Sequence, residues 1–182
     1  GVPFRFPANY NSPSTTAEIN SGQIGHLLTN APNASNTAVT SEISENQAFG
    51  VDIVNYLRGD DTNEEFGRGF RNRNSVLGDI VNSDPYFVDV PDGRYPDDLE
   101  AKSYNAFVTG NAARQGVVYV GANDGMLHGF DGDTGAELIA YIPSAVYRNL
   151  DDLASPVYGH SYFVDGGPNV IDVFLDDTPD PA

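Results

Sequence analysis

The chain has 182 residues and a formal net charge of −17 at pH 7, and it contains neither cysteine nor tryptophan. This length suits one ordinary domain with an appendage, and the absence of cysteine excludes disulfides, zinc thiolates and cysteine nucleophiles. With Lys102 as the single lysine and no apolar run of the roughly 18 residues that a membrane helix needs, we expect no nucleic-acid partner and no membrane span.

The first third of the chain divides into two parts. Residues 1–41 are rich in Ser, Thr, Asn and Pro without a sustained hydrophobic period, which predicts an extended or loop-rich segment. Residues 42–58 place apolar side chains three to five positions apart. These are Ile43, Ala48, Val51, Val54 and Leu57. We therefore predict a helix over 42–58, with Ser41 or Ser44 as its N-cap and Gly59 as its C-cap.

The middle of the chain is dominated by loop signals. Residues 59–74 are polar and glycine-rich, which predicts a loop. The next segment has a β-branched apolar core at 76–81, which predicts a strand that ends before Asp84-Pro85. Residues 91–107 carry an Asp-Gly turn and two prolines, so we predict an excursion on the surface.

The clearest pattern begins at Val117. Residues 117–122, 126–131 and 137–142 are rich in β-branched and aromatic side chains, and the sequences NDG and GDTG separate them. Asn, Asp and Gly tolerate the backbone angles of tight turns. The pattern therefore predicts a three-stranded antiparallel meander with Gly125 at positive φ.

The end of the chain has weaker signals for helical turns and for further strands. Residues 143–153 suggest one or two short helical turns. The stretches HSYFVDG (160–166) and NVIDVFL (169–175) are joined by Gly-Gly-Pro. We interpret them as two further strands.

Two features of the meander could indicate chemistry. Asp131, Asp133 and Gly135 resemble the start of a calcium loop, but such a loop needs an oxygen ligand at its fifth position and Glu at its twelfth. Here those positions hold Gly135 and Ile142, so a turn is favoured. His128 lies among apolar residues of a strand, which favours a structural histidine over a catalytic one.

Five stretches occur in one order and carry a family resemblance. They are VNYLRGD (54–60), FRNRNSVLGDIVNSDP (70–85), VYVGANDGMLHGFD (118–131), TGAELIAYIPSAV (134–146) and YGHSYFVDGGP (158–168). Together they resemble the start of the C-terminal propeller domain of the PilC/PilY family. Its members are type IV pilus biogenesis factors and tip adhesins. The resemblance covers about residues 42–173.

The resemblance implies a mainly β fold. We expect a partial β-propeller, about one blade plus part of a second, preceded by a helix and a loop-rich N-terminal segment. In terms of domains, residues 1–41 form that segment and residues 42–182 begin a quinoprotein-like propeller. A closed ring needs at least four blades, so we expect the chain to be a segment of a longer protein.

The resemblance also implies a function. We expect a non-catalytic module of a protein secreted through the periplasm to the cell surface and the pilus tip. Its expected partners are minor pilins, host-cell or surface ligands and the rest of the parent propeller. Family members bind calcium in an Asp/Asn-rich loop that this chain lacks. We therefore assign no cofactor or metal ligand here; a calcium site of the family kind would have to lie elsewhere in the parent protein.

The candidate site residues are adhesion and contact residues. Arg58-Gly59-Asp60 matches an integrin-type adhesion tripeptide, and the alternative is that Gly59 only caps the helix. Arginine and tyrosine often anchor interfaces. The candidate partner contacts are accordingly Arg68, Arg71, Arg73, Tyr95 and Tyr104. Alternatively, Arg71 and Arg73 pair with nearby acids in the parent protein.

An enzyme remains the competing hypothesis. Blades of quinoprotein dehydrogenases share the turn pattern, but those enzymes stack their cofactor on tryptophan and often use vicinal cysteines. The chain has neither residue type, which argues against a dehydrogenase.

Overall fold

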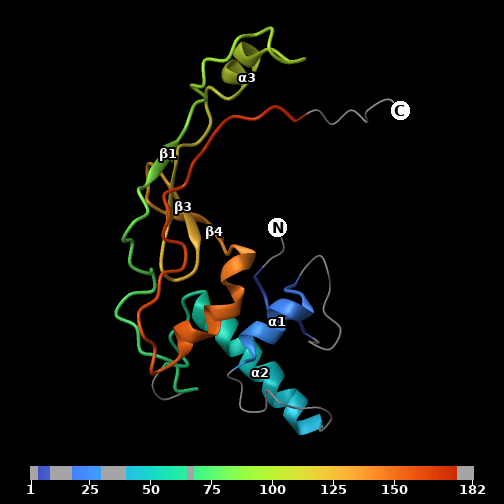
Figure 1. The fold of residues 1–182 in the computed structure, drawn as a ribbon, viewed down its shortest axis with the longest axis vertical. Helices are drawn as coiled ribbons and strands as arrows, with labels where there is room; N and C mark the ends of the chain where they lie inside the picture. Colours follow the sequence, from blue (N-terminus) through green and yellow to red (C-terminus); the bar gives the residue numbers. More distant parts are fainter. Residues whose placement is uncertain (1–3, 9–17, 30–39, 65–67, 176–182) are drawn as a thin grey trace, which may run out of the picture.

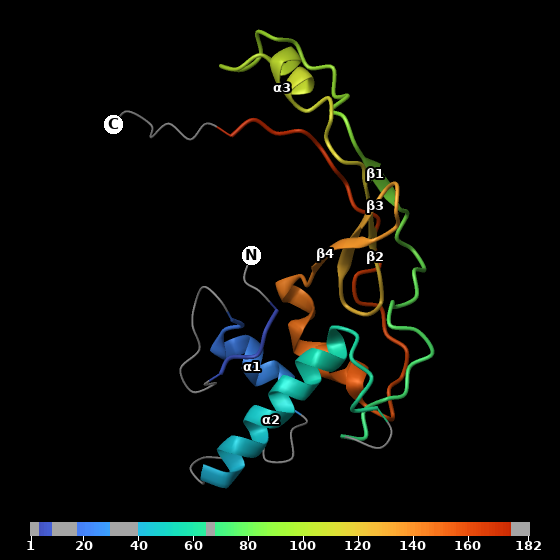
Figure 2. The same cartoon turned by 180° about the vertical axis from the view of Figure 1, so that it is seen from behind.

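The computed structural model describes residues 4–8, 18–29, 40–64 and 68–175. Its elements are α1 (Ser21–Leu27), α2 (Thr40–Leu57), β1 (Tyr86–Val88), α3 (Tyr104–Gly110), β2 (Val117–Gly121), β3 (Leu127–Asp131), β4 (Glu137–Tyr141) and the 3₁₀ helix η1 (Ser144–Ala154). The molecule is elongated, with α1, α2 and η1 at one end, the sheet in the middle and α3 at the other end (Figure 1). The chain after η1 runs back along the sheet toward α3 (Figure 2).

A short helix, α1, lies in the segment that the sequence predicts to be loop-rich. It begins with a capping box, in which the Asn20 side chain accepts from the Gln23 N–H at 3.0 Å and the Gln23 side chain accepts from the Asn20 N–H at 2.8 Å. Ile24 and Leu27 are buried. The loop prediction is therefore wrong for residues 21–27, while 1–3, 9–17 and 30–39 lie outside the described residues.

The helix predicted over 42–58 is confirmed by α2. Ser41 and Ser44 lie inside this helix, so the prediction that one of them caps it is wrong. The predicted apolar stripe is also partly wrong, because Val51 is 38% exposed. Among the side chains of α2 that the structure describes, the buried apolar ones are Phe49, Ile53, Val54, Tyr56 and Leu57.

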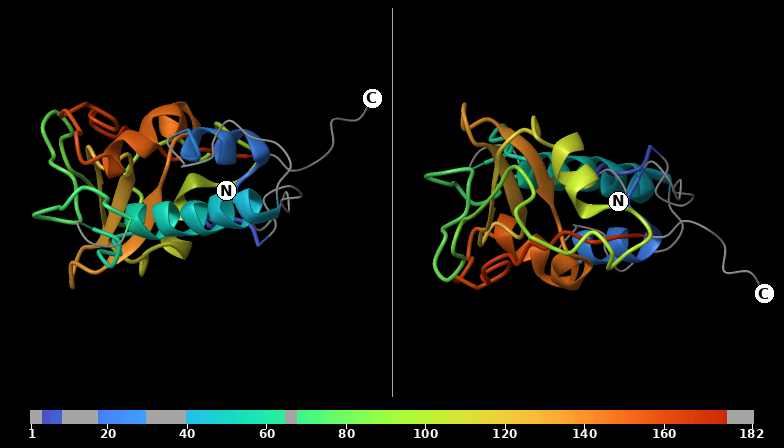
Figure 3. Two further views of the ribbon diagram at one scale, coloured as in Figure 1. Left: turned by 90° about the horizontal axis from the view of Figure 1, so that it is seen from below. Right: turned by 90° about the horizontal axis from the view of Figure 1, so that it is seen from above.

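The hydrophobic core lies in the helical end of the molecule. There α1 and η1 pack side by side, with α2 across from them (Figure 3). The η1 helix confirms the helical turns predicted after Pro143, and it buries Tyr147, Leu150 and Leu153. Phe70, from the 59–74 loop, packs edge-on against Tyr56 with ring centroids 5.3 Å apart. The core therefore fixes this loop against α2.

The four strands form one open antiparallel sheet in the order β1-β2-β3-β4. Strands β2, β3 and β4 confirm the predicted meander. Val120 pairs with His128, and His128 pairs with Ala140. One such sheet is what a single propeller blade requires, so the predicted partial propeller is confirmed.

Two tight turns set the register of the meander. Gly125 has φ of +93° and Gly135 has φ of +72°, a region that other residues rarely adopt. In the first turn the Ala122 N–H donates to the Met126 carbonyl at 3.0 Å, and in the second the Gly135 N–H donates to the Asp131 carbonyl at 2.9 Å. Gly125 at positive φ is as predicted.

Three predicted strands are not formed. Residues 76–81 form a loop whose apolar side chains are largely exposed, and β1 begins only after Pro85. This loop is held by the Gly78 N–H, which donates to Asp124 Oδ2 at 2.8 Å. Residues 160–166 and 169–175 also join no ladder in the part of the chain that the structure describes.

The surface excursion at 91–107 is confirmed, and its last residues begin α3. The Ser103 hydroxyl caps this helix and accepts from the Ala106 N–H at 3.1 Å. Of the helices that the structure describes, none combines the length and apolar character needed to cross a bilayer.

Candidate functional site

Arg58-Gly59-Asp60 forms the C-terminal cap of α2. Gly59 has φ of +108°. Its N–H donates to the Tyr56 carbonyl at 2.9 Å, and the Asp60 N–H donates to the Asn55 carbonyl at 3.0 Å. These two bonds define a Schellman motif. The predicted capping role of Gly59 is therefore confirmed.

Both charged side chains of the tripeptide are exposed yet bonded within the chain. Arg58 Nη1 donates to the Phe4 carbonyl at 3.2 Å. Asp60 Oδ1 accepts from the Thr62 hydroxyl at 2.6 Å and from the Thr62 N–H at 2.8 Å. These bonds from Thr62 lower the pKa of Asp60. The tripeptide is thus held in one conformation at the surface, and adhesion through it stays a prediction.

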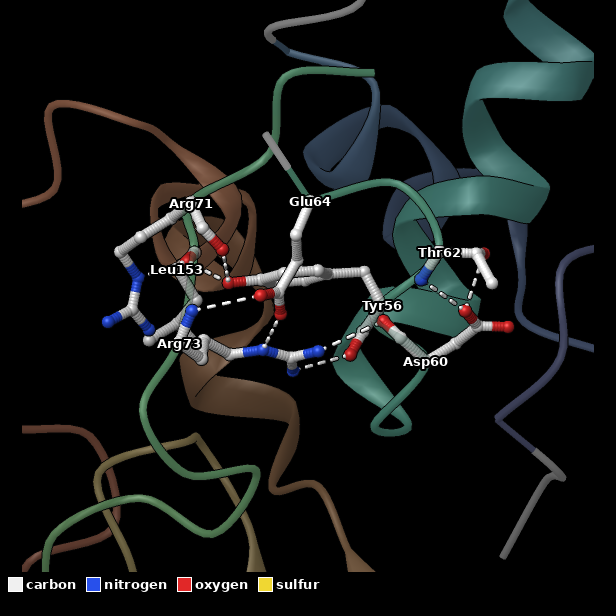
Figure 4. A network of polar contacts seen from close by, with 7 residues as sticks. All are labelled: Tyr56, Asp60, Thr62, Glu64, Arg71, Arg73 and Leu153. Carbon is white, nitrogen blue, oxygen red and sulfur yellow. Dashed lines mark hydrogen bonds and ion pairs between the residues drawn. The ribbon is translucent and has the colours of Figure 1, made fainter. Parts of the chain in front are cut away.

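Arg73 lies at the centre of a polar network that joins the 59–74 loop to α2 (Figure 4). Its Nε donates to Glu64 Oε1 at 2.6 Å. Its Nη1 donates to the Tyr56 carbonyl at 2.7 Å, and its Nη2 donates to the Asp60 carbonyl at 2.9 Å. The guanidinium lies 3.7 Å from the Tyr56 ring centroid, and the Arg73 side chain is only 7% exposed. This geometry gives Arg73 a structural role.

Hydrogen bonds from Arg73 also favour the ionised form of Glu64. Burial disfavours the ionised form of Glu64, but the hydrogen bonds from Arg73 outweigh this effect, so the pKa of Glu64 is lowered. Glu64 is therefore ionised at neutral pH. Arg73 therefore pairs with a nearby acid, Glu64, as the alternative interpretation of this residue predicts.

Arg71 joins the same network from the other side. Its Nε donates to the Leu153 carbonyl at 2.9 Å, and its guanidinium lies 4.6 Å from the Tyr158 ring centroid. The Tyr56 hydroxyl lies within hydrogen-bond distance of the Arg71 and Leu153 carbonyl oxygens, at 3.0 and 3.1 Å. Burial raises the pKa of Tyr56. Arg71 thus connects the loop to η1 through a carbonyl and a ring.

Arg68 is bound to two acids of α2. Its Nε lies 2.6 Å from Asp52 Oδ2, and its Nη1 contacts Glu45 Oε1. The hydrogen bond to Asp52 is the main reason that the pKa of Arg68 is raised. Its side chain is 22% exposed, so part of it remains accessible.

The two candidate tyrosines lie together at the α3 end of the molecule. Tyr95 and Tyr104 pack edge-to-face with ring centroids 5.1 Å apart. The Tyr104 hydroxyl donates to Asp172 Oδ2 at 2.5 Å and accepts from the Gly93 N–H at 2.8 Å. Tyr95 is 41% exposed. The candidate contact residues therefore occupy two separate places, since the arginine loop lies at the helical end.

His128 is buried on β3, as expected for a structural histidine, and it has two carboxylate partners. Its Nδ1 lies 2.6 Å from Glu137 Oε1, and its Nε2 lies 3.1 Å from Asp124 Oδ2. Each ring nitrogen faces a carboxylate, so the ring must carry both protons to donate twice. Burial opposes this charge, but the two carboxylates outweigh it and raise the pKa of His128.

The register of the meander could have indicated one of these partners. The turn at 123–125 places Asp124 four residues before His128, beside the start of β3. The sequence pattern does not show that β4 places Glu137 beside Nδ1 of the ring, because the β3–β4 pairing is irregular between Gly129 and Phe130.

The Asp-rich turn after β3 is occupied by its own backbone. Asp131 Oδ1 accepts from the Asp133 N–H at 2.9 Å and from the Thr134 N–H at 2.7 Å. The bond from Thr134 is the main cause of the lowered pKa of Asp131. The predicted turn is therefore present. Among the described residues, no cluster of three or more His, Cys, Asp or Glu side chains is arranged to hold a metal ion.

Comparison with known proteins assigns the chain to a family. A family model described as the PilY1 beta-propeller domain matches residues 77–180. The chain is 45% identical to a type IV pilus biogenesis factor PilY1 homolog of Xylella fastidiosa over 125 residues, 66% of this chain and 10% of that protein.

Two Pseudomonas aeruginosa proteins named type IV pilus biogenesis factor PilY1 are also similar. The protein of strain PAK is 45% identical over 134 residues, 69% of this chain and 11% of that protein. The protein of strain UCBPP-PA14 is 38% identical over 176 residues, 92% of this chain and 14% of that protein. No solved structure matches at a significant level.

These relatives are far longer than the chain, which spans between 10% and 14% of their length. Their names give no support to the dehydrogenase hypothesis. The order of motifs from VNYLRGD to YGHSYFVDGGP indicates the same family as the comparison does. Because the matching model covers more than half of the residues, the chain belongs to the PilY1 β-propeller family.

Proposed function

We propose that this chain serves type IV pilus biogenesis as a non-catalytic module that presents contact surfaces at the pilus tip. The observation that carries the proposal is the family match over residues 77–180, together with relatives named as type IV pilus biogenesis factors. In this proposal the partners are minor pilins and ligands on host cells or other surfaces. The module acts outside the cell after export through the periplasm.

The distribution of polar bonds supports a non-catalytic role. The carboxylates of Glu64 and Asp131 bond an arginine and backbone amides, respectively. His128 uses both ring nitrogens on carboxylates. A general base needs a free nitrogen or oxygen within reach of a reacting proton. These groups instead hold loops and strands together.

Two exposed regions are the proposed contact surfaces. The first is the end of α2 with Arg58 and Asp60, and the second is the excursion at 91–107, which carries Tyr95. Loops held by a rigid scaffold are where recognition concentrates. The polar network around Arg73 gives the first region such a scaffold, and the bonds of Tyr104 do so for the second.

One face of the sheet is proposed to pack against the rest of the parent propeller. Tyr86, Tyr119 and Ile139 lie opposite one another across the strands, with Gly129 between the last two. Tyr86 and Ile139 are 44% and 48% exposed. A blade needs neighbours to cover its faces, and this apolar row fits such a contact.

The tripeptide is tested by a matched pair of variants in the full-length protein that contains this chain. Asp60→Ala removes the carboxylate that adhesion would use, and it also removes the bonds from Thr62. Thr62→Ala removes only the hydroxyl bond to Asp60. We expect Asp60→Ala to reduce attachment to cells or abiotic surfaces, while Thr62→Ala attaches like the parent.

The measurements are surface piliation, attachment and the amount of secreted protein. Equal loss of attachment in both variants would show that only the conformation of the loop matters. Parental attachment in both would remove the tripeptide from the contact surface.

A further inference from the structure

We propose that a small aromatic pocket beside α3 binds the ammonium group of a lysine side chain on a partner protein. The pocket, here called the cage pocket, is lined chiefly by Tyr95, Tyr104, Phe107, Phe174, Glu100 and Asp172. Its volume is about 100 Å³, well below the roughly 300–1,000 Å³ of sites for drug-sized ligands. The space therefore suits a single small group.

The aromatic walls of the cage pocket are held in place. Tyr104 packs edge-to-face on Tyr95 at 5.1 Å and lies 5.9 Å from the ring centroid of Phe107. The Tyr104 hydroxyl is fixed by Asp172 and by the Gly93 N–H. Four aromatic residues line this one small space, and an aromatic ring attracts a cation placed over its face through its quadrupole.

The charge around the cage pocket also favours a cation. Its lining contains two acidic residues, Glu100 and Asp172, and one cation, Lys102, and the chain as a whole carries a net charge of −17. Burial and the hydrogen bond to Asp172 raise the pKa of Tyr104, so the tyrosine stays neutral and its ring keeps the negative face that a cation contacts.

The chain already places an ammonium group at this pocket. Lys102 is its only lysine, and its Nζ lies 6.0 Å from the Phe174 ring centroid. That distance is at the outer limit of about 6 Å for a cation–π contact. The internal contact is therefore weak, and an incoming ammonium group that comes closer would displace it.

The lining favours a primary ammonium over a quaternary one. Carboxylate and hydroxyl oxygens accept hydrogen bonds, and a lysine ammonium has three donors to give them. A trimethylated nitrogen has none. Glu100 and Asp172 supply such oxygens at the pocket, which is why we assign lysine as the occupant.

This inference rests on the proposed function in one respect: both treat the 91–107 excursion as a contact surface. Lysine binding and pilus function can nevertheless fail independently of each other. Binding is measured on the full-length protein by ligand-observed NMR. The probe is Nα-acetyl-lysine methylamide, and the uncharged control is the norleucine analogue of the same shape. A third probe carries trimethyl-lysine. Piliation is counted in parallel, so a loss of pilus function without a loss of probe binding is recognised.

Two variants and one control test the pocket. Tyr95→Leu removes a ring, and we expect it to weaken lysine binding about two- to fivefold. Lys102→Met removes the internal ammonium group, and we expect tighter binding by a similar factor. Tyr162→Leu changes a tyrosine that is 63% exposed and does not line the pocket, so it should leave binding unchanged.

Each outcome decides the proposal. Lysine binding above norleucine binding, with opposite effects of Tyr95→Leu and Lys102→Met, supports it. Equal binding of norleucine would show an apolar cavity only. Tighter binding of trimethyl-lysine would overturn the primary ammonium assignment. No binding, or binding that is insensitive to Tyr95→Leu, would overturn the site itself.

Discussion

Buried charged side chains connect the loops of this molecule to its regular elements. Arg73 bonds Glu64, Tyr56 and Asp60 at once, and His128 bonds carboxylates on both sides of its ring. Removing one partner of such a buried pair leaves the other charge unpaired, which costs more than the pair itself contributes. The strongest effects of single substitutions are therefore expected at these positions.

Arg73→Met should open the 59–74 loop. The variant leaves the Glu64 carboxylate, 11% exposed, without its charged partner, although the backbone N–H of residue 73 still donates to it. We expect local stability to fall by about 2–4 kcal/mol, seen as faster hydrogen exchange of residues 59–64 and 68–74 in the full-length protein. Arg148→Met, an exposed position on η1, is the control. Equal exchange in both variants would show that the network contributes little.

His128 should make the β3–β4 pairing sensitive to pH. Its pKa in the folded protein is raised above the unfolded value of about 6.5. The stabilisation is therefore complete below about pH 6.5 and is lost as pH rises through the folded pKa. The loss amounts to about 1.4 kcal/mol for each unit of the shift. Hydrogen exchange of β3 and β4, corrected for the intrinsic pH effect, measures it.

His128→Gln is the matched variant for that experiment. Glutamine retains a donor but does not titrate in this range. The pH dependence of β3–β4 protection should therefore disappear. If it persists, another group is responsible, and the assignment to His128 is wrong.

At the scale of elements, substitutions in the two turns of the meander distinguish the effect of backbone strain on stability from the effect of steric crowding. Gly125 and Gly135 both have positive φ. A Cβ at Gly125 would lie 2.5 Å from Leu150 Cδ2, whereas a Cβ at Gly135 would meet nothing within 4 Å. Gly135→Ala therefore tests the strain alone, and Gly125→Ala adds a clash with the core.

We expect Gly135→Ala to cost about 1–2 kcal/mol of local stability, and Gly125→Ala to cost clearly more, because a packed core tolerates little added volume. Hydrogen exchange of β2, β3 and β4 in the full-length protein provides the comparison. Equal costs would mean that Leu150 moves aside without loss of packing.

The sequence correctly predicts those elements that depend on the conformational preferences of adjacent residues. The NDG turn, the strands on either side of it and the Gly59 cap each follow from backbone preferences of a few adjacent residues. In contrast, residues 76–81 have strand-like composition but run as a loop, because β1 occupies the edge of β2 instead. Composition does not identify which segment pairs with a free edge.

The candidate site also contains features that the sequence predicts and features that it does not. Gly59 was predictable as a cap, since its position follows the last apolar residue of α2. The partners of Arg71 and Arg73 could not be predicted from the sequence. The carbonyl groups of Leu153 and Tyr56 lie next to these arginines only in the folded chain. The helix α1 had a readable signal, the Asn20–Gln23 capping box, but only two turns of sequence to support it.

On the scale of the whole molecule, the core lies at one end of the sheet. Most of its buried apolar residues gather at the helical end, and Met126 and Ile142 from the meander join them, whereas β4 is exposed along its length. Ile171, Val173 and Leu175 are also more than 60% exposed at alternate positions. Alternation of this kind is typical of a strand with one unpaired face. It is consistent with a segment that completes its packing within a longer propeller.

Residues 169–175 should therefore be protected in the full-length protein. We expect slow hydrogen exchange there, because neighbouring strands would bond this segment and cover its apolar side chains. The substitution Val173→Asp should release the segment, while Asn169→Asp, before the alternating residues, should not. Fast exchange of 169–175 in the unmodified protein would show that the segment remains unpaired.

The central claim is tested most directly by a variant of the full-length protein in which a Gly/Ser linker of equal length replaces residues 94–102 of the excursion. The measurement is the number of surface pili and of attached cells. If this chain works by presenting contact surfaces in pilus biogenesis, the protein should be secreted at the parental level while piliation or attachment falls. Parental piliation and attachment, with the linker protein secreted normally, would contradict a contact role for this surface.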